Sequence, residues 1–504
     1  MVGVAVSTIP ELFEAAVAEA ADSVWLRTDA GQWTYGEARG RIVAAASALA
    51  QRGAGRGELV LATTRNTPDH LFMWLGLMYL GAIFVPVNPR GTDAELAALV
   101  DQVSPRLVLG DAQVAALAQD SSAAAATPAG PAHPDDPAVL IPTSGTTGRS
   151  KLVIQTQRAY AMAGEGFPWW MELDADDRLM TSLPLFHINA PAYSVLGSVA
   201  ARAALVLLER FSASTFLESA RRHGATEFNS IGAMLEILMR QPERPDDAET
   251  PLRLCYTGPS PTRERQLEIE RRLGLRVVCG YALSESPYGV IWARGTRPYG
   301  TLGSPRQHPT LGTINEARVV HDEAAVAAGE VGELQLRNPV VMRGYWGMPE
   351  ETELVLLPGG WLRTGDLVRD NGDETYTFVG REKDIIRRRG ENLAPVEVED
   401  TLMAHPDVAQ AAVIGVASDL SEDDVKAFVV PATGAAAVNL ADVRRWASER
   451  LSAFKVPRYV ELVAELPHTP TGRIAKHELP AGLTGNETDF ENQPTTPTGD
   501  HLRP

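Results

Sequence analysis

The feature that most restricts the fold is an uncharged apolar run from Leu71 to Val87. Such a run either crosses a membrane or forms part of a protein interior. It is shorter than the ~20 apolar residues that a spanning helix needs, and Gly81 divides it. The part before Gly81 predicts a buried helix, and the part after it predicts a buried strand that ends at Asn88-Pro89. We therefore expect a folded core and no membrane segment.

Strand-like and helical segments alternate along most of the chain. Residues 10–21 predict a helix, because Leu12, Phe13, Ala16 and Val17 share one face. Further strands are expected at residues 59–62, 106–109, 204–208 and 276–279. This alternation is typical of the α/β class. We expect a multidomain α+β arrangement in which the large N-terminal domain consists of mixed α/β subdomains.

Changes in composition indicate the domain organisation. Residues 112–137 are rich in Ala, Pro, Ser and Asp and predict a loose surface connection, whereas residues 311–343 predict a β-rich subdomain of short strands. A further change lies near residue 380. We expect a large domain over 1–380, a small mobile α+β domain over 381–480, and a disordered tail over 481–504, which has few large apolar side chains to bury.

Charge and cysteine content restrict the partners and the compartment. The chain has 46 Lys and Arg against 64 Asp and Glu, a formal charge of −18, which argues against binding nucleic acid or an anionic membrane. Its two cysteines, Cys255 and Cys279, lie in apolar runs, and two lone thiols suggest a reducing compartment. The first 21 residues contain no Lys or Arg, unlike a signal peptide. We expect a cytoplasmic protein.

Residues 143–151 form the most informative motif, Thr-Ser-Gly-Thr-Thr-Gly-Arg-Ser-Lys. Its glycines allow a tight turn that directs backbone N–H groups at an anion, its hydroxyls add donors, and its lysine adds a cation. It is not a Walker A loop. On these residues alone, a phosphate site and a flexible turn are equal alternatives. The candidate phosphate ligands are Thr143, Ser144, Gly145, Thr146, Thr147, Gly148 and Lys151.

This loop resembles the phosphate loop of the adenylate-forming superfamily, which includes acyl-CoA synthetases, luciferases and nonribosomal adenylation domains. Further motifs similar to that family follow in the family's order, and the resemblance covers about Ile9 to Leu479. The nearest resemblance is to the crotonobetaine/carnitine-CoA ligase-like branch. The motifs are Leu-Pro-Leu-Phe-His at 183–187, Gly-Tyr-Ala-Leu-Ser-Glu at 280–285, Trp-Leu-Arg-Thr-Gly-Asp at 361–366, Gly-Arg-Glu-Lys-Asp at 380–384 and Pro-Thr-Gly-Arg at 470–473.

The resemblance implies ATP and Mg²⁺ as cofactors and assigns residues to them. Glu285 would bind Mg²⁺, since a carboxylate is a hard donor for a hard cation. The alternative is a solvated acid at a helix start. Tyr281 would contact adenine, although it is otherwise an ordinary core aromatic. Asp366 and Arg381 would hold the ribose, although Thr-Gly-Asp is otherwise a turn. The remaining nucleotide residues implied are Gly258, Pro259 and Ser284.

Other positions carry implied roles in acid binding and domain movement. His187 would lie near the reacting carboxylate, with a satisfied core histidine as the alternative. Lys383 would be the hinge about which the small domain rotates, with a solvated linker lysine as the alternative. A small, polar or aromatic carboxylic acid would bind at His187, Asn229, Gly232, Gly258, Gly280 and Ser284.

One position departs from the family pattern. Most relatives carry a lysine after the last motif's glycine, and that lysine binds the α-phosphate and the acid. Here the position is Arg473, and Lys476 follows three residues later. Arginine keeps the charge but is bulkier. We expect Arg473 to take the catalytic role, with Lys476 as the alternative.

The implied activity is that of an acid:CoA ligase that forms an acyl-adenylate. No phosphopantetheine attachment motif is present, so the acceptor is expected to be a separate molecule, coenzyme A. The run Arg387-Arg388-Arg389 either meets CoA phosphates or is a solvated face. Two other functions stay open: a diazotase that activates nitrite for transfer to an arylamine, and a degenerate nucleotide-binding module without ligase activity.

Overall fold

The computed structural model describes residues 8–117, 132–143, 150–258, 260–388, 391–418, 423–432, 438–468 and 474–491, without the side chains of residues 233, 383, 391 and 392. The chain forms two compact units. The first comprises Met1–Thr364 with Arg369–Thr377, and the second comprises Gly365–Val368 with Phe378–Pro504. Helices combine with two mainly parallel sheets and with further sheets that are mainly antiparallel, which confirms the mixed α/β class. Across these described ranges, no helix combines the length and apolarity needed to cross a membrane.

The uncharged run forms a helix and a strand, as predicted. Helix α3 (Pro68–Leu80) begins after Thr67, whose hydroxyl accepts from the His70 N–H, and every residue from 70 to 80 is buried. The helix ends at Gly81, which has a φ of 66° and allows the chain to turn directly into strand β4 (Ile83–Val87). Strand β4 is buried along its whole length. The run is therefore part of the hydrophobic core.

A nine-stranded sheet carries most of the candidate site of the first unit. Its strands β12, β11, β10 and β8 are parallel neighbours, so their carboxyl ends meet at one edge. Ligands bind at such edges in open α/β sheets. The order is β14 (Ser304–Pro305), β13 (Ser286–Ile291), β12 (Arg276–Leu283), β11 (Leu254–Thr257), β10 (Glu227–Asn229), β8 (Arg178–Thr181), β9 (Ala204–Leu207), β1 (Val24–Thr28) and β2 (Gly31–Thr34).

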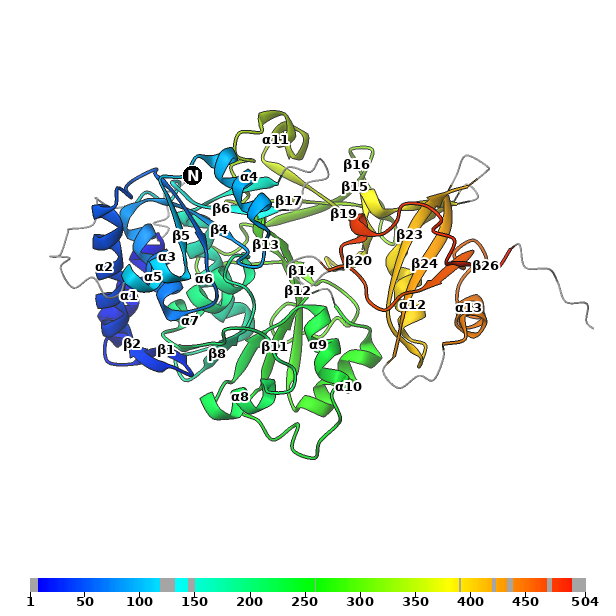
Figure 1. The fold of residues 1–504 in the computed structure, drawn as a ribbon, viewed down its shortest axis with the longest axis horizontal. Coiled ribbons are helices and arrows are strands. Elements are labelled where there is room, and N and C mark those ends of the chain that lie inside the picture. Colours follow the sequence, from blue (N-terminus) through cyan, green and yellow to red (C-terminus); the bar gives the residue numbers. More distant parts are fainter. Residues whose placement is uncertain are drawn as a thin grey trace, which may run out of the picture. The chain divides into compact units, whose positions relative to one another are not determined.

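A second sheet of five strands lies beside helices of the N-terminal region (Figure 1). Its order is β5 (Leu107–Gly110), β3 (Leu59–Thr63), β4, β6 (Pro137–Thr143) and β7 (Lys151–Thr156). The helices of these two layers are α1 (Ile9–Ala20), α2 (Tyr35–Gln51), α4 (Asp93–Val103), α5 (Asp111–Leu117), α6 (Gln157–Met171), α7 (Leu196–Ala201), α8 (Phe216–His223), α9 (Gly232–Met239), α10 (Arg263–Leu273) and the π-helix η1 (Ala190–Val195).

Helix α5 corrects one sequence expectation. Residues 112–137 were expected to be a loose connection, but α5 occupies the first part of this stretch and buries Val114 and Leu117. Its alanine-rich composition favours a helix as well as a loop, and the two apolar residues decide the outcome by packing. Residues 118–131 lie outside the described residues.

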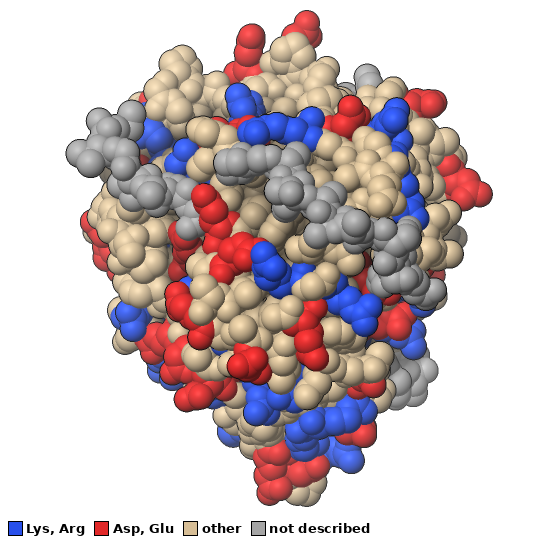
Figure 2. All heavy atoms as spheres, turned by 90° about the vertical axis from the view of Figure 1, so that its left-hand side faces the viewer, with Lys and Arg blue, Asp and Glu red and all other residues tan. Residues whose placement is uncertain are grey.

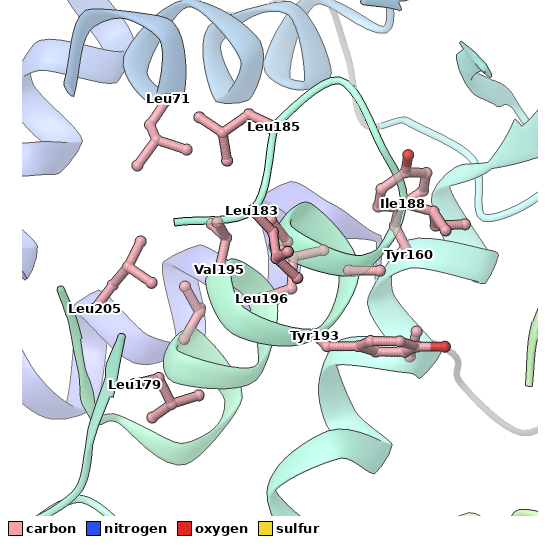
Figure 3. Packing of buried hydrophobic residues seen from close by; sticks show 14 of the residues in the cluster. Leu71, Tyr160, Leu179, Leu183, Leu185, Ile188, Tyr193, Val195, Leu196 and Leu205 are labelled. Carbon is pink, nitrogen blue, oxygen red and sulfur yellow. The ribbon is translucent and has the colours of Figure 1, made fainter. Parts of the chain in front are cut away.

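The core of the first unit joins both sheets and includes the loop before η1. Figure 3 shows Leu183 and Leu185 of this loop packed between helices, with Leu71 of α3 beside Leu185. Leu179 and Leu205 contribute from neighbouring strands of the nine-stranded sheet. The loop that carries His187 therefore starts from a buried, well-packed anchor.

Residues 311–343 contain short strands, as predicted. They belong to a sheet in the order β16 (Ala324–Ala325), β15 (Glu316–His321), β17 (Val331–Arg337), β19 (Trp361–Asp370) and β18 (Leu356–Leu357), with β20 (Tyr376–Arg381) paired to β19. Helix α11 (Pro349–Val355) precedes β18.

The second unit has its own sheet and its own core. Val398 and Leu402 of α12 pack with Val443 and Ala447 of α13 against this sheet. The strand order is β23 (Val408–Ala417), β24 (Asp423–Pro431), β25 (Tyr459–Leu462) and β26 (Thr488–Asp489). The other elements are a hairpin of β21 (Ile386–Arg388) and β22 (Glu391–Leu393), the helices α12 (Pro395–Met403) and α13 (Leu440–Ser448), and the short helices η2 (Glu382–Asp384) and η3 (Lys476–Glu478).

The expected disordered tail does not begin at residue 481. Strand β26 pairs antiparallel with β25, so the prediction is wrong for residues 481–491. Ion pairs hold this segment: the Arg458 guanidinium lies 3.0 Å from Asp489, and the buried Lys426 amino group lies 3.2 Å from Glu487. The sequence argument considered only apolar burial and missed these charges. Residues 492–504 lie outside the described residues.

Charged side chains are mixed over the face drawn in Figure 2. Lys and Arg lie among Asp and Glu there, so the described residues of that face form no continuous basic surface. This distribution fits a chain whose net charge is −18.

Candidate active site

The two described ends of the candidate phosphate loop lie together at the end of a hairpin. Thr143 ends β6 and is paired with Lys151, which begins β7. The Thr143 hydroxyl donates to the Lys151 carbonyl at 3.1 Å. Residues 144–149, which carry Ser144, Gly145, Thr146, Thr147 and Gly148, lie outside the described residues. The hairpin thus gives the loop a narrow and rigid base.

Lys151 and Glu285 contact the same tyrosine. The Lys151 Nζ lies 4.9 Å from the centre of the Tyr345 ring, and the Tyr345 hydroxyl donates to Oε1 of Glu285 at 3.1 Å. Burial, with the Glu285 carboxylate beside it, raises the pKa of Tyr345, so the hydroxyl stays protonated as a donor. Glu285 lies in the turn between β12 and β13, so the alternative of an acid at a helix start is wrong.

Tyr345 was missed by the sequence analysis. It lies 60 residues after Glu285 and follows no motif that suggests chemistry. Its position is determined by the loop before α11: its N–H donates to the Thr352 hydroxyl at 2.9 Å, and residues on both sides of it bond to β7. No sequence signal in this single chain connects it to Glu285.

The ends of β11 and β12 approach each other closely where two predicted site glycines lie. A Cβ on Gly258 would lie 2.4 Å from the Gly280 carbonyl oxygen, and a Cβ on Gly280 would lie 2.9 Å from the Tyr256 ring. Neither position accepts a side chain without movement of the backbone or a buried ring. Pro259 lies outside the described residues. The glycines therefore allow the ends of β11 and β12 and the Tyr256 ring to approach each other this closely.

Tyr281 and Ser284 occupy the adjacent part of β12 and its turn. Tyr281 is half-buried and paired with Val290 of β13. The Ser284 carbonyl accepts from Nε2 of Gln155 at 2.6 Å, and Gln155 is a fully buried residue of β7. This bond connects the strand that follows the phosphate loop with the turn that carries Glu285.

One residue of the predicted acid pocket, the buried Asn229, forms an amide pair with the half-buried Asn189. Asn229 ends β10 with a side chain that is 1% exposed, and its Nδ2 donates to Oδ1 of Asn189 at 2.7 Å. Asn189 lies two residues after the half-buried His187, directly before η1, and was missed by the sequence analysis. Gly232 begins α9, close after Asn229 in the chain. π-Helical turns such as η1 occur frequently at functional sites.

The two predicted ribose ligands meet in the second unit. Nε of Arg381 lies 3.1 Å from Oδ1 of Asp366, which is almost fully buried, whereas the Arg381 side chain is 43% exposed. Asp366 lies within β19, so the alternative of an isolated turn is wrong. The ion pair orients the carboxylate and leaves part of the guanidinium accessible.

Lys476 is engaged in an ion pair. Its Nζ lies 2.6 Å from Oε1 of Glu399, and the same carboxylate oxygen accepts from the Val413 N–H at 2.7 Å. Burial raises the pKa of Glu399, and the Lys476 charge opposes this shift. Arg473 lies outside the described residues, as does the side chain of Lys383, whose backbone belongs to η2. The geometry thus gives Lys476 a structural partner.

The expectations for the run of three arginines are wrong for its middle member. Arg388 is 2% exposed, so it neither meets CoA phosphates nor faces solvent. Its guanidinium binds Asp424 at 3.1 Å and Glu491 at 2.9 Å, and also donates to the carbonyls of Phe454 and Val456. Arg387 is exposed, and Arg389 lies outside the described residues.

Comparisons with known proteins match most of the chain. The family model described as AMP-binding enzyme matches residues 13–346, and the one described as AMP-binding enzyme C-terminal domain matches residues 397–473. The crotonobetaine/carnitine–CoA ligase of Salmonella heidelberg (strain SL476) is 29% identical over 488 residues, covering 89% of this chain and 93% of the relative.

Solved structures show the same fold. ATP-bound MatB from Rhodopseudomonas palustris superposes with a TM-score of 0.84 at 26% identity, covering 94% of this chain and 98% of that one. The anthranilate CoA ligase AuaEII in complex with anthranoyl-AMP has a TM-score of 0.85 at 23% identity, covering 94% of this chain and 96% of that one. At that identity the second likeness concerns the fold alone.

Proposed function

Because the chain belongs to the AMP-binding enzyme family, we propose that it is an AMP-forming acid:CoA ligase. A carboxylate oxygen attacks the α-phosphorus of ATP, and pyrophosphate leaves. The CoA thiol then attacks the acyl carbonyl of the adenylate, AMP leaves, and a thioester forms. The relative named above as a CoA ligase supports this assignment.

The contact between Lys151, Tyr345 and Glu285 is the observation that carries the proposal. The Lys151 amino group, at the base of the phosphate loop, and the Glu285 carboxylate both contact Tyr345. ATP needs both groups. The cation binds its anionic phosphates, and the carboxylate binds the Mg²⁺ ion that ATP carries. A single carboxylate fits Mg²⁺, which is usually held by one or two carboxylates together with substrate phosphates. When bound, Mg²⁺ neutralises charge that develops on the phosphates.

Residues of the sheet edge would hold the rest of the nucleotide. Tyr281 would cover the adenine, with Gly258, Pro259 and Ser284 beside it, since all four lie at or after the carboxyl ends of β11 and β12. Asp366 would accept the ribose hydroxyls, oriented by its ion pair with Arg381.

The acid would bind beside the Asn189–Asn229 amide pair. His187, Gly232, Gly258 and Gly280 complete this proposed pocket, and no charged side chain is among them. Such a lining suits a small or aromatic carboxylic acid whose substituents are uncharged or hydrogen bond to amides.

The small domain, proposed here as residues 381–480, would supply the remaining chemistry. Arg473 would bind the α-phosphate and the acid carboxylate, because the ion pair with Glu399 occupies Lys476. Rotation of the small domain about Lys383 would convert the enzyme from the conformation that forms the adenylate to the conformation that forms the thioester. The CoA acceptor would come as a separate molecule. No observation on the described residues favours nitrite and an arylamine, or a module without activity.

The test is a pyrophosphate-release assay with a panel of carboxylic acids, with and without CoA, followed by mass analysis. We expect an acyl-adenylate without CoA and a thioester with it. Glu285→Gln should reduce pyrophosphate release at least about 100-fold. The exposed Glu58 provides the matched control, since Glu58→Gln should retain full activity. A product that forms only from nitrite and an arylamine, or nucleotide binding without any product, would overturn the proposal.

A further inference from the structure

Arg306 is a fully buried arginine of the first unit and has no part in the functions assigned above. It follows β14 and directs its guanidinium into the layer between the nine-stranded sheet and α6. All of its N–H groups reach oxygen atoms of the protein. Nε donates to the Val290 carbonyl at 3.4 Å, Nη1 to the Tyr193 hydroxyl at 2.8 Å and the Pro287 carbonyl at 3.1 Å, and Nη2 to the Tyr256 hydroxyl and the Tyr281 carbonyl, the latter at 3.5 Å.

Aromatic rings take the place that a carboxylate usually has beside a buried arginine. The guanidinium carbon lies 4.7 Å from the centre of the Trp170 ring, 5.0 Å from that of Tyr193 and 5.6 Å from that of Tyr256. Among the described residues, the hydrogen-bond acceptors of Arg306 are hydroxyls and carbonyls, and none is a carboxylate. A buried charge without a counterion is costly, so a neutral side chain would serve better if packing were its only role.

Several acceptors of Arg306 lie next to residues of the candidate active site. Tyr281 precedes the turn that carries Glu285, and Pro287 follows it, so the guanidinium holds the backbone on both sides of this turn. Tyr193 belongs to η1, which begins directly after Asn189. Figure 3 shows its hydroxyl directed away from the leucines of the core. One side chain therefore connects the turn that carries Glu285 with η1, the helix that follows the loop of His187.

We propose that Arg306 is a positioning residue. It holds the turn that carries Glu285 in the position that binds Mg²⁺–ATP, and it fixes the position of this turn relative to η1. This inference rests on the proposed function. The five-donor fork is suited to the task, because a planar guanidinium fixes several acceptors in one geometry, which a lysine does not. Displacement of catalytic groups by about 1 Å is enough to reduce a rate about 100-fold.

Arg306→Lys tests the proposal by keeping the charge and removing the fork. The measurements are the Mg²⁺ concentration for half-maximal pyrophosphate release, the KM for ATP, and calorimetric ATP binding with and without Mg²⁺. We expect the half-saturating Mg²⁺ concentration to rise about tenfold or more, with a smaller change in ATP binding in the absence of Mg²⁺. Tyr256→Phe and Tyr193→Phe remove one acceptor each and should give smaller shifts in the same direction.

Arg272 provides the matched control for burial. It is a 7% exposed arginine of α10 whose guanidinium binds Asp247 and three carbonyls away from the strand ends. Arg272→Lys should lower the melting temperature and leave the Mg²⁺ dependence unchanged. The inference is wrong if Arg306→Lys folds and its half-saturating Mg²⁺ concentration stays within twofold of the wild-type value. If Arg306→Lys does not fold, the inference is wrong when both tyrosine variants stay within twofold. Because ATP binding needs no acid, this outcome is separable from a failure of the proposed ligase activity.

Discussion

The amino group of Lys476 lies 2.6 Å from a carboxylate oxygen of the buried Glu399. The same carboxylate accepts from the backbone of β23, and Glu399 is almost fully buried. Arg473, three residues earlier in the chain, lies outside the described residues.

Arg473→Ala should lower pyrophosphate release about 100-fold or more with little change in stability, because it removes the proposed phosphate ligand. Lys476→Ala should destabilise the protein by about 3 kcal/mol, because it leaves the Glu399 charge buried without a partner. Pyrophosphate assays and urea unfolding measure the two effects. Lys476→Met combined with Glu399→Gln should restore stability. A larger loss of pyrophosphate release in Lys476→Ala than in Arg473→Ala would contradict the assignment.

Tyr345→Phe should raise the KM for Mg²⁺–ATP about tenfold, because it removes the hydrogen bond of 3.1 Å to Glu285 and keeps the ring beside Lys151. Tyr345→Leu also removes the ring and should have a larger effect. Steady-state kinetics at several Mg²⁺ concentrations provide the measurement. Tyr299→Phe, at a tyrosine that contacts arginines elsewhere in the first unit, is the control. Equal KM values for Tyr345→Phe and wild type would exclude this role.

Glu227 should make stability depend on pH. Burial, with Asp177 nearby, raises its pKa well above the usual range, so the folded protein keeps a proton that the unfolded chain releases. Stability from this residue is greatest below the unfolded pKa of about 4.5 and falls as pH rises, by up to about 1.4 kcal/mol per pH unit. Glu227→Gln should remove this fall and stabilise the protein at pH 7. Urea unfolding between pH 4 and pH 8 measures this dependence, with Glu58→Gln as the control. If the free energy of unfolding depends on pH with the same slope in Glu227→Gln as in wild type, the prediction is wrong.

Arg387 and Arg388 should behave differently despite being neighbours. Arg387→Gln should raise the KM for CoA several-fold, since Arg387 is exposed and available to the CoA phosphates. Pyrophosphate release should not change, because CoA binds only for the second step, thioester formation. Arg388→Met should instead lower the melting temperature, because the buried Asp424 then keeps only one of its two arginine partners, Arg458. Thioester kinetics and thermal unfolding distinguish the two outcomes. An unchanged KM for CoA in Arg387→Gln would remove this run from CoA binding altogether.

Local pattern was sufficient for several elements of this protein. The uncharged run forms α3 and β4 because its helix, its glycine and its strand follow from neighbouring residues. The ordered motifs also supplied most residues of the candidate site, and two of them, Asp366 and Arg381, form an ion pair in the structure. These motifs are informative because phosphate and ribose chemistry needs glycines, hydroxyls and charges within short segments.

Contacts between distant segments were decided only by the tertiary structure. Tyr345 reaches Glu285, and Arg306 reaches oxygens on four other segments, without any periodicity that could reveal it. The same holds for the burial of Arg388 and for strand β26, where ion pairs order a segment poor in apolar residues. A charge in a sequence has no partner until the fold brings one to it. The sequence alone therefore determined the elements and the family, while packing determined which charged side chains bind ligands and which hold the protein together.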